Sequence, residues 1–137
     1  MAVCSSYTVL DGGDRNQRNT LQNYTTCDGK DLAPGWYRFQ EAAGYWMADK
    51  CTPMFRCGTS APGWLSGAHP TVAEGVVTRK VCFSWYNNCC EWDNTIRVRN
   101  CGAYYVYELS YTPICPARYC GNADAGEFLS LSAKTQT

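Results

Sequence analysis

Cysteine constrains this chain more than any other residue, because ten cysteines occur within only 137 residues. Such a density in a short chain is typical of small secreted domains whose folds are held by disulfide bonds. Zinc is the alternative, but structural zinc sites need cysteines about two to four residues apart and usually include histidine. The chain has no Cys-x-x-Cys motif, and His69 is its only histidine. We therefore expect five disulfides, no metal site and no cofactor.

The cysteine content indicates an oxidising compartment, so we expect a secreted, extracellular protein. A single domain is expected over residues 1–137, with a core at 4–120 and a short C-terminal extension at 121–137. The N-terminus, Met1-Ala2-Val3-Cys4, is not a charged-then-apolar leader, which favours a mature chain. No apolar run approaches the ~20 residues of a membrane span. The formal net charge is zero, so nucleic acid and anionic membranes are not expected as partners.

The strand signals predict a mainly β fold, a small disulfide-rich domain with short antiparallel strands, hairpins and long loops. In residues 95–99, Ile96 and Val98 alternate with polar side chains and are expected to face inward. The turn Asn100-Cys101-Gly102 then predicts a hairpin with the following strand. Strands are expected at 36–39, 76–83, 95–99, 103–109 and 127–131; loops at 12–14, 59–63, 63–70 and 121–124; and a frayed end at 132–137.

A series of motifs between residues 35 and 120 is similar to a known family. The motifs are Gly35-Trp36-Tyr37-Arg38-Phe39, Met47 before Cys51, Arg56-Cys57-Gly58-Thr59, Ala61-Pro62-Gly63-Trp64-Leu65, Gly67-Ala68-His69-Pro70, Glu74-Gly75-Val76-Val77-Thr78-Arg79, Cys89-Cys90-Glu91-Trp92 and Tyr104-Tyr105-Val106-Tyr107. In this order they resemble the cysteine-rich extracellular domain of uromodulin and the related zymogen-granule glycoprotein. The resemblance extends over residues 4–120 and includes all ten cysteines.

The number of cysteines alone leaves the disulfide connectivity open. The resemblance implies the pairs Cys4–Cys101, Cys27–Cys115, Cys51–Cys89, Cys57–Cys120 and Cys82–Cys90. Adjacent cysteines in a relaxed strand point to opposite faces, so Cys89 and Cys90 are expected to bond different neighbours. We expect this segment to be the rigid centre of the domain.

The family also displays N-linked glycans to bacterial adhesins, from a sequon that follows the Tyr-Tyr-Val-Tyr motif. This chain has Glu108-Leu109-Ser110 there, which contains no asparagine, so the resemblance does not carry that role to this position. The only sequon is Asn23-Tyr24-Thr25, where Asn23 is a candidate for surface glycosylation.

Recognisable catalytic motifs are absent from the sequence. A serine or cysteine nucleophile needs a base, and His69 is directly followed by Pro70. The acid pairs Asp28/Asp31 and Glu91/Asp93 would form a glycosidase dyad only if folding brought two carboxylates together. We interpret these acids as solvated surface residues and expect that the protein is not an enzyme.

Aromatic residues are in excess, with five Trp, ten Tyr and four Phe, and some are expected on the surface. An aromatic ring can cover the apolar face of a pyranose while polar side chains bond its hydroxyls. Three segments combine both properties, and their candidate carbohydrate contacts are Trp46, Trp64, His69, Glu74, Tyr86, Asn87 and Asn88. The alternative for each is a core ring beside a turn residue, which we favour for Trp36, Trp64 and Trp92. For His69 the alternative is a turn histidine that bonds the backbone.

Our leading hypothesis is a secreted lectin that binds neutral sugars, without metal, on cell-surface glycans or glycoproteins. The alternative is a structural, adhesion or innate-defence module that binds protein partners or displays an N-glycan at Asn23. Because one shallow site binds weakly, we expect a homodimer or a dimer of dimers. Residues 121–131 are expected to contribute to the contact, the alternative being that this tail covers its own domain.

Overall fold

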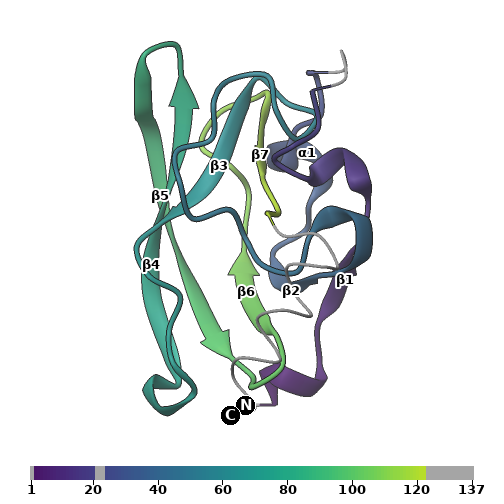
Figure 1. The fold of residues 1–137 in the computed structure, drawn as a ribbon, viewed down its shortest axis with the longest axis vertical. Helices are drawn as coiled ribbons and strands as arrows, with labels where there is room; N and C mark the ends of the chain where they lie inside the picture. Colours follow the sequence, from purple (N-terminus) through teal and green to yellow (C-terminus); the bar gives the residue numbers. More distant parts are fainter. Residues whose placement is uncertain (1, 21–23, 123–137) are drawn as a thin grey trace.

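The computed structural model describes residues 2–20 and 24–122, and this part of the chain is built around one seven-stranded sheet (Figure 1). The strand order is β1-β2-β6-β5-β4-β3-β7. The strands are β1 (Thr8–Leu10), β2 (Gly35–Phe39), β3 (Ala61–Ser66), β4 (Val76–Trp85), β5 (Asn88–Asn100), β6 (Tyr105–Leu109) and β7 (Ala117–Tyr119). The helix α1 (Asp28–Asp31) and the 3-10 turns η1 (Val3–Ser5), η2 (Gly13–Arg15), η3 (Glu41–Ala43) and η4 (Val72–Glu74) connect them. The mainly β, disulfide-rich class is confirmed.

The central hairpins follow the residue pattern of the sequence. Strands β2, β4 and β5 contain the predicted ranges 36–39, 76–83 and 95–99, whereas β6 begins at Tyr105, two residues later than expected. Ile96 and Val98 are buried, as their alternation predicts. Val98 pairs with Tyr107 across the β5–β6 hairpin. The sequence did not indicate the parallel pairings at the two ends of the sheet, β1 with β2 and β3 with β7.

The prediction of loops across residues 59–63 and 63–70 is wrong for Ala61–Ser66, which form strand β3. Proline and glycine suggested a loop because both are unfavourable in strand interiors. Pro62 lies before the register with β4, which starts at Gly63, and it pairs only with β7. A Cβ on Gly63 would lie 2.6 Å from the Phe83 ring. The glycine therefore makes room for a core side chain within a strand.

The sheet curls until the segments that follow its two edge strands meet. After β1, Arg15 and Gln17 hydrogen-bond to Gly121, which follows β7. The Gln17 N–H donates to the Gly121 carbonyl at 2.7 Å, and the Gly121 N–H donates to the Arg15 carbonyl at 3.0 Å. A Cβ on Gly121 would lie 1.8 Å from the Ala43 carbonyl oxygen, so this contact requires glycine. The curled sheet thereby encloses its inner face.

Five disulfides are present, and they join the pairs that the resemblance implies: Cys4–Cys101, Cys27–Cys115, Cys51–Cys89, Cys57–Cys120 and Cys82–Cys90. Cys89 and Cys90 do bond different neighbours. Their segment is not the centre of the domain, however, because it lies near the tip of the long β4–β5 hairpin in Figure 1. Only Asn88 separates the hairpin turn, at Tyr86 and Asn87, from Cys89, which is why the cysteine pair lies beside the tip.

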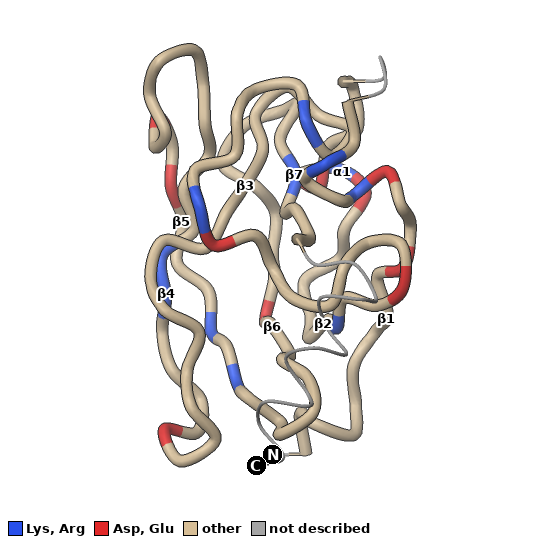
Figure 2. The backbone as a smooth tube through the Cα atoms, viewed as in Figure 1, with Lys and Arg blue, Asp and Glu red and all other residues tan. Residues whose placement is uncertain are grey.

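A buried ionic cluster joins α1 to β7, where Figure 2 shows basic and acidic segments converging. The Asp28 carboxylate is 1% exposed and accepts hydrogen bonds from Arg15, at 2.7 and 3.1 Å, and from the Tyr119 N–H, at 2.8 Å. Arg118 Nε lies 3.8 Å from the same carboxylate. The expectation that Asp28 is a solvated surface acid is therefore wrong. Burial lowers the pKa of Arg118, since it disfavours the charged form.

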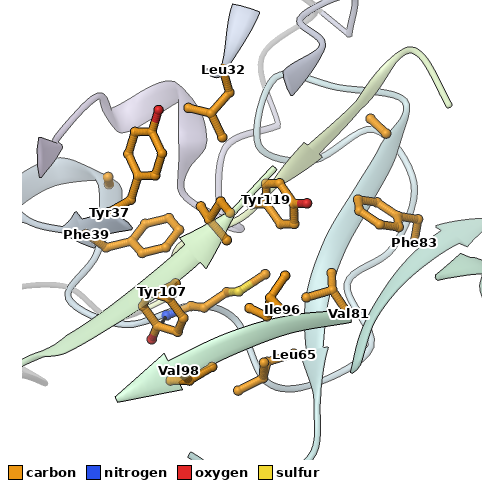
Figure 3. Close-up of a cluster of buried hydrophobic side chains, with 14 of the residues drawn as sticks. Leu32, Tyr37, Phe39, Leu65, Val81, Phe83, Ile96, Val98, Tyr107 and Tyr119 are labelled. Atoms are coloured by element: carbon orange, nitrogen blue, oxygen red, sulfur yellow. Dashed lines mark hydrogen bonds between the residues drawn. The ribbon is translucent and has the colours of Figure 1, made fainter. Parts of the chain in front are cut away.

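The hydrophobic core fills the inner face of the curled sheet (Figure 3). Ile96 and Val98 from β5 contribute apolar side chains, while Phe39, Tyr107 and Tyr119 contribute rings from three further strands. The Phe39 and Tyr107 rings meet edge to face, with centroids 5.4 Å apart. Tyr107 has no exposed surface, and its hydroxyl accepts a hydrogen bond from the Met47 N–H at 2.8 Å. This hydroxyl connects the core to the surface cavity that includes His69.

Several predictions lie outside the described residues. These are the strand at 127–131, the frayed end at 132–137, the glycosylation of Asn23 and most of the proposed contact segment 121–131. Within residues 2–20 and 24–122, no helix combines the length and apolar character that a membrane crossing would need.

Candidate functional site

A surface cavity of about 570 Å³ brings together side chains from three separate segments. The residues from Trp46 to Lys50 follow η3, the turn around His69 follows β3, and Tyr105 begins β6. The cavity is lined by Trp46, Asp49, Lys50, Gly67, Ala68, His69 and Tyr105. Of the predicted carbohydrate contacts, Trp46 and His69 therefore share one site.

Backbone hydrogen bonds fix the wall that carries Trp46. The Trp46 carbonyl accepts from the Asn122 N–H at 2.9 Å. Ala48 donates to the Cys120 carbonyl at 2.8 Å and accepts from the Leu65 N–H at 2.6 Å. The segment is thus bound to the chain around the Cys57–Cys120 disulfide and to β3, which holds the indole in place without regular secondary structure.

The opposite wall is a turn held by β4 and β5. Gly67, the residue that directly follows β3, has φ +140°, a conformation that favours glycine. Arg79 Nε donates to the Ala68 carbonyl at 2.9 Å, and Asn100 Nδ2 donates to the Pro70 carbonyl at 3.1 Å. Both contacts come from neighbouring strands, so the position of His69 follows from the sheet.

His69 is held by side chains, not by the backbone bond that the alternative hypothesis assumed. Its Nε2 lies 2.7 Å from the Tyr107 hydroxyl, and its Nδ1 lies 3.7 Å from Asp49 Oδ2. Tyr107 already accepts from Met47, so its proton is free to be donated to Nε2. In neutral His69 the proton then resides on Nδ1, facing Asp49. The ring also packs on Tyr105, with centroids 4.4 Å apart.

Besides His69, three polar side chains line the cavity: the anionic Asp49, the neutral Tyr105 and the cationic Lys50. The pKa of Asp49 is lowered, first by polar contact with the His69 side chain, so the carboxylate is ionised at neutral pH. Burial, followed by the charge of Asp49, raises the pKa of Tyr105, which keeps its hydroxyl protonated. Lys50 is exposed and forms no ion pair within residues 2–20 and 24–122. Hydrogen-bond donors and acceptors are therefore both available to a ligand.

The order Asp49, His69, Tyr107 resembles the carboxylate, imidazole and hydroxyl of a hydrolase triad. Tyr107 is fully buried, however, and burial raises its pKa well above the ordinary value of 10.0. A hydroxyl that neither reaches solvent nor ionises readily is a poor nucleophile. The arrangement orients His69 instead.

Two of the predicted contacts lie outside the cavity and have structural partners. Trp64 packs on the cluster around Cys57 and Cys120, and its indole N–H donates to the Cys89 carbonyl at 2.9 Å. Glu74 closes the capping box of η4 with Thr71 and lies 3.9 Å from Arg79. The backbone hydrogen bond from Thr71 lowers the pKa of Glu74.

The remaining candidates form the tip of the β4–β5 hairpin. Tyr86 is 76% exposed, and its φ of 51° is unusual for a residue other than glycine. Its backbone N–H points at the sulfur of Met54, 2.6 Å away. Asn88 donates to Glu91 at 2.8 Å, and Asn87 lies in the turn. The tip has exposed aromatic surface but contributes nothing to the lining of the cavity.

Asp49, Lys50 and Tyr105 are cavity residues that sequence reasoning missed. Asp49 and Lys50 follow Trp46 by three and four residues, so polar side chains beside that ring were visible in the sequence. Tyr105 belongs to the motif Tyr104-Tyr105-Val106-Tyr107, for which the sequence predicted no role in binding. Within residues 2–20 and 24–122, no group of three or more His, Cys, Asp or Glu side chains could hold a metal ion.

Comparison with known proteins relates this structure to a family. A domain family described as uromodulin-like matches residues 37–121. The pancreatic secretory granule membrane major glycoprotein GP2 of Canis lupus familiaris is 47% identical over 121 residues, which are 88% of this chain and 23% of that protein. The human GP2 protein is 41% identical over 118 residues, covering 85% of this chain and 21% of its own length.

Mouse uromodulin is 44% identical over 94 residues, which are 68% of this chain and 15% of that protein. The chain thus spans less than a quarter of the length of these relatives. The matched residues include most of the sheet and the cavity, and the fold contains the five expected disulfides. From this agreement we conclude that the chain belongs to the uromodulin-like family of cysteine-rich domains.

Proposed function

We propose that this domain is an extracellular carbohydrate-binding protein, a lectin, that binds neutral sugars in the cavity around His69 without a metal ion. The observation that carries the proposal is the presence of an indole, a carboxylate and a phenol in one open cavity. A pyranose needs an aromatic surface for its C–H face and fixed polar groups for its hydroxyls. The name of the GP2 relatives places those proteins at a secretory granule membrane, which agrees with an extracellular site.

Each cavity residue has a distinct part in this proposal. Trp46, which is half-buried, covers the apolar face of the sugar. Asp49 accepts hydrogen bonds from sugar hydroxyls, while Tyr105 and Lys50 donate to sugar oxygens. His69 acts as a positioning residue, because its ring supports Asp49 on one side and Tyr105 on the other. Such a site discriminates sugars by the positions of their hydroxyls.

Trp46→Ala is expected to weaken sugar binding by roughly ten- to a hundredfold, the amount that a lost large apolar contact implies. A glycan array of neutral and acidic sugars identifies the ligand, and calorimetry then compares the variants. Tyr86→Ala is the matched control, since it removes an exposed ring outside the cavity. Binding is expected to survive a chelator.

An array without any binding glycan, or equal losses in Trp46→Ala and Tyr86→Ala, would contradict this proposal. The first result favours the alternative function, an adhesion or innate-defence module that binds protein. The observation behind that alternative is the aromatic tip, where Tyr86 lies beside Trp85 with ring centroids 5.2 Å apart. A third possibility, display of an N-glycan at Asn23, is tested by mass spectrometry of the secreted chain.

We also propose that the domain assembles into a homodimer or a dimer of dimers, to which residues 121–131 contribute. A second linked site can raise avidity by ~10²–10⁴, which a weak single site requires. Light scattering of the intact chain is expected to give twice or four times the monomer mass. Truncation after Asn122, which keeps the backbone hydrogen bonds of Gly121 and Asn122, is expected to lower that mass. A monomeric intact chain refutes the assembly, and an oligomer that survives truncation refutes the role of the tail.

A further inference from the structure

A second binding surface lies on the outer face of the sheet, opposite the core. Paired residues of neighbouring strands share a face. Arg97 pairs with Thr78 on β4 and with Glu108 on β6, and Arg99 pairs with Val76 and Val106. Arg97 and Arg99 alternate with the buried Val98, so they point away from the core, whereas Val106 is itself fully buried and the outer face is covered at its position.

Four basic side chains gather on this outer face. Lys80 on β4 pairs with Thr95, which lies two positions from Arg97 along β5. Arg38 on β2 follows Tyr37, which pairs with Tyr107, so Arg38 lies in the same row as Val106 and Arg99. We call Arg38, Lys80, Arg97 and Arg99 the basic face. From strand geometry, neighbouring members lie about 7–10 Å apart. Figure 2 shows the basic segments of β4 and β5 close together, although the whole chain has zero formal net charge.

Two members of the basic face are held in place. Arg97 forms a bidentate pair with Glu108, at 2.8 and 2.7 Å, and its guanidinium lies 5.5 Å from the centre of the Trp36 ring. The hydrogen bond from Arg97 lowers the pKa of Glu108. Arg38 donates to the Tyr7 hydroxyl at 2.9 Å and lies 3.9 Å from the centre of the Tyr104 ring.

The other two members have no such partners. Neither the Lys80 nor the Arg99 side chain has a hydrogen bond, ion pair or ring contact within residues 2–20 and 24–122. Glu108 is already engaged by Arg97, and the nearest further acid on this face, Asp93, pairs with Cys82, one row beyond Lys80. The four basic side chains outnumber Glu108 and Asp93, the two acids that strand pairing places beside them, so the basic face carries net positive charge on the outer surface of the sheet.

We propose that the basic face binds a linear polysaccharide that carries sulfate or carboxylate groups. Guanidinium groups form bidentate bonds with such oxyanions, and ammonium groups pair with them as point charges. The Trp36 ring and the hydroxyls of Thr78 and Thr95 lie among the charges and suit the sugar units between them. An extended polyanion contacts several rows of this surface at once.

This site is independent of the cavity proposed for neutral sugars. Tyr105 lines the cavity, whereas the next residue, Val106, shares the outer face with Arg99. The two sites therefore lie on opposite faces of β6, so an experiment can refute the proposal for one site without affecting the proposal for the other. The net charge of zero had argued against polyanionic partners, but net charge does not report how charges are distributed.

Heparin is the probe, and dextran is the uncharged comparison. The variant Lys80→Gln/Arg99→Gln is expected to bind heparin roughly ten- to thirty-fold more weakly than wild type in 50 mM NaCl. The matched control, Arg18→Gln/Lys30→Gln, removes one arginine and one lysine charge from exposed positions outside both proposed sites and is expected to bind within about twofold of wild type. Wild-type affinity is expected to fall steeply as salt rises, and this readout needs no variant.

Failure of wild type to bind heparin in 50 mM NaCl overturns the proposal. So does an equal loss in the Arg18→Gln/Lys30→Gln control, which would assign binding to net charge. Poly-glutamate binding as tightly as heparin would identify an acidic peptide as the partner and overturn the polysaccharide assignment. Circular dichroism and thermal unfolding confirm that both variants are folded.

Discussion

Asp28→Ala is expected to lower the free energy of unfolding by about 3–5 kcal/mol, because it removes the carboxylate with which the buried Arg15 is paired. The carboxylate contacts two guanidinium groups and the Tyr119 N–H. Arg15 and Arg118 are only 6% and 8% exposed, so water cannot replace the lost acceptor. A loss of this size is a large fraction of the ~5–15 kcal/mol by which a typical domain is stable. Denaturant unfolding with the disulfides intact measures it.

Asp31→Ala is the matched control, since Asp31 lies in the same helix but is exposed. Its expected effect is within about 0.5 kcal/mol of wild type. Asp28→Asn should fall between the two variants, because the amide retains one acceptor oxygen and loses the charge. A change of less than about 1 kcal/mol for Asp28→Ala would mean that Arg15 and Arg118 find other acceptors or water.

Asp28 also illustrates what the sequence could not predict. Its partners Arg15 and Arg118 lie 13 and 90 residues away, so no local pattern indicates that the three will meet. The strand around Ile96 and Val98 was predictable, because alternation with polar residues is a local property. The parallel edges of the sheet were not, since they depend on which distant segments pair.

The cavity residues, too, could be predicted only in part from local sequence patterns. Trp46 and His69 were recognised because aromatic and polar side chains suited to a sugar occur in short segments. That these two segments share a cavity follows only from the fold, as does the participation of Tyr105. Trp64 and Glu74 satisfied the same local criterion, yet one packs on a disulfide and the other caps a helical turn. Residue type therefore indicates candidate contacts, and only the tertiary structure shows which of them lie in one cavity.

Removal of the Cys4–Cys101 disulfide is expected to destabilise the domain about 2 kcal/mol more than removal of Cys82–Cys90. The two bridges have sequence separations of 97 and 8 residues. A bridge stabilises the fold mainly by restricting the unfolded chain, and the entropy lost grows with the logarithm of the loop length. The corresponding contributions are about 4.7 and about 2.5 kcal/mol.

The comparison uses Cys4→Ala/Cys101→Ala and Cys82→Ala/Cys90→Ala, which both remove two sulfur atoms and keep the other bridges. Strand pairing from Lys80↔Thr95 to Val76↔Arg99 holds the β4–β5 hairpin without its bridge, so loss of Cys82–Cys90 leaves that part of the sheet paired. The segment around Cys4 depends more on its bridge, since the 3-10 turn η1 adds only a short element there. Urea unfolding of the two variants gives the difference. Equal losses, or a larger loss for Cys82–Cys90, would show that local packing at the hairpin outweighs chain entropy in this fold.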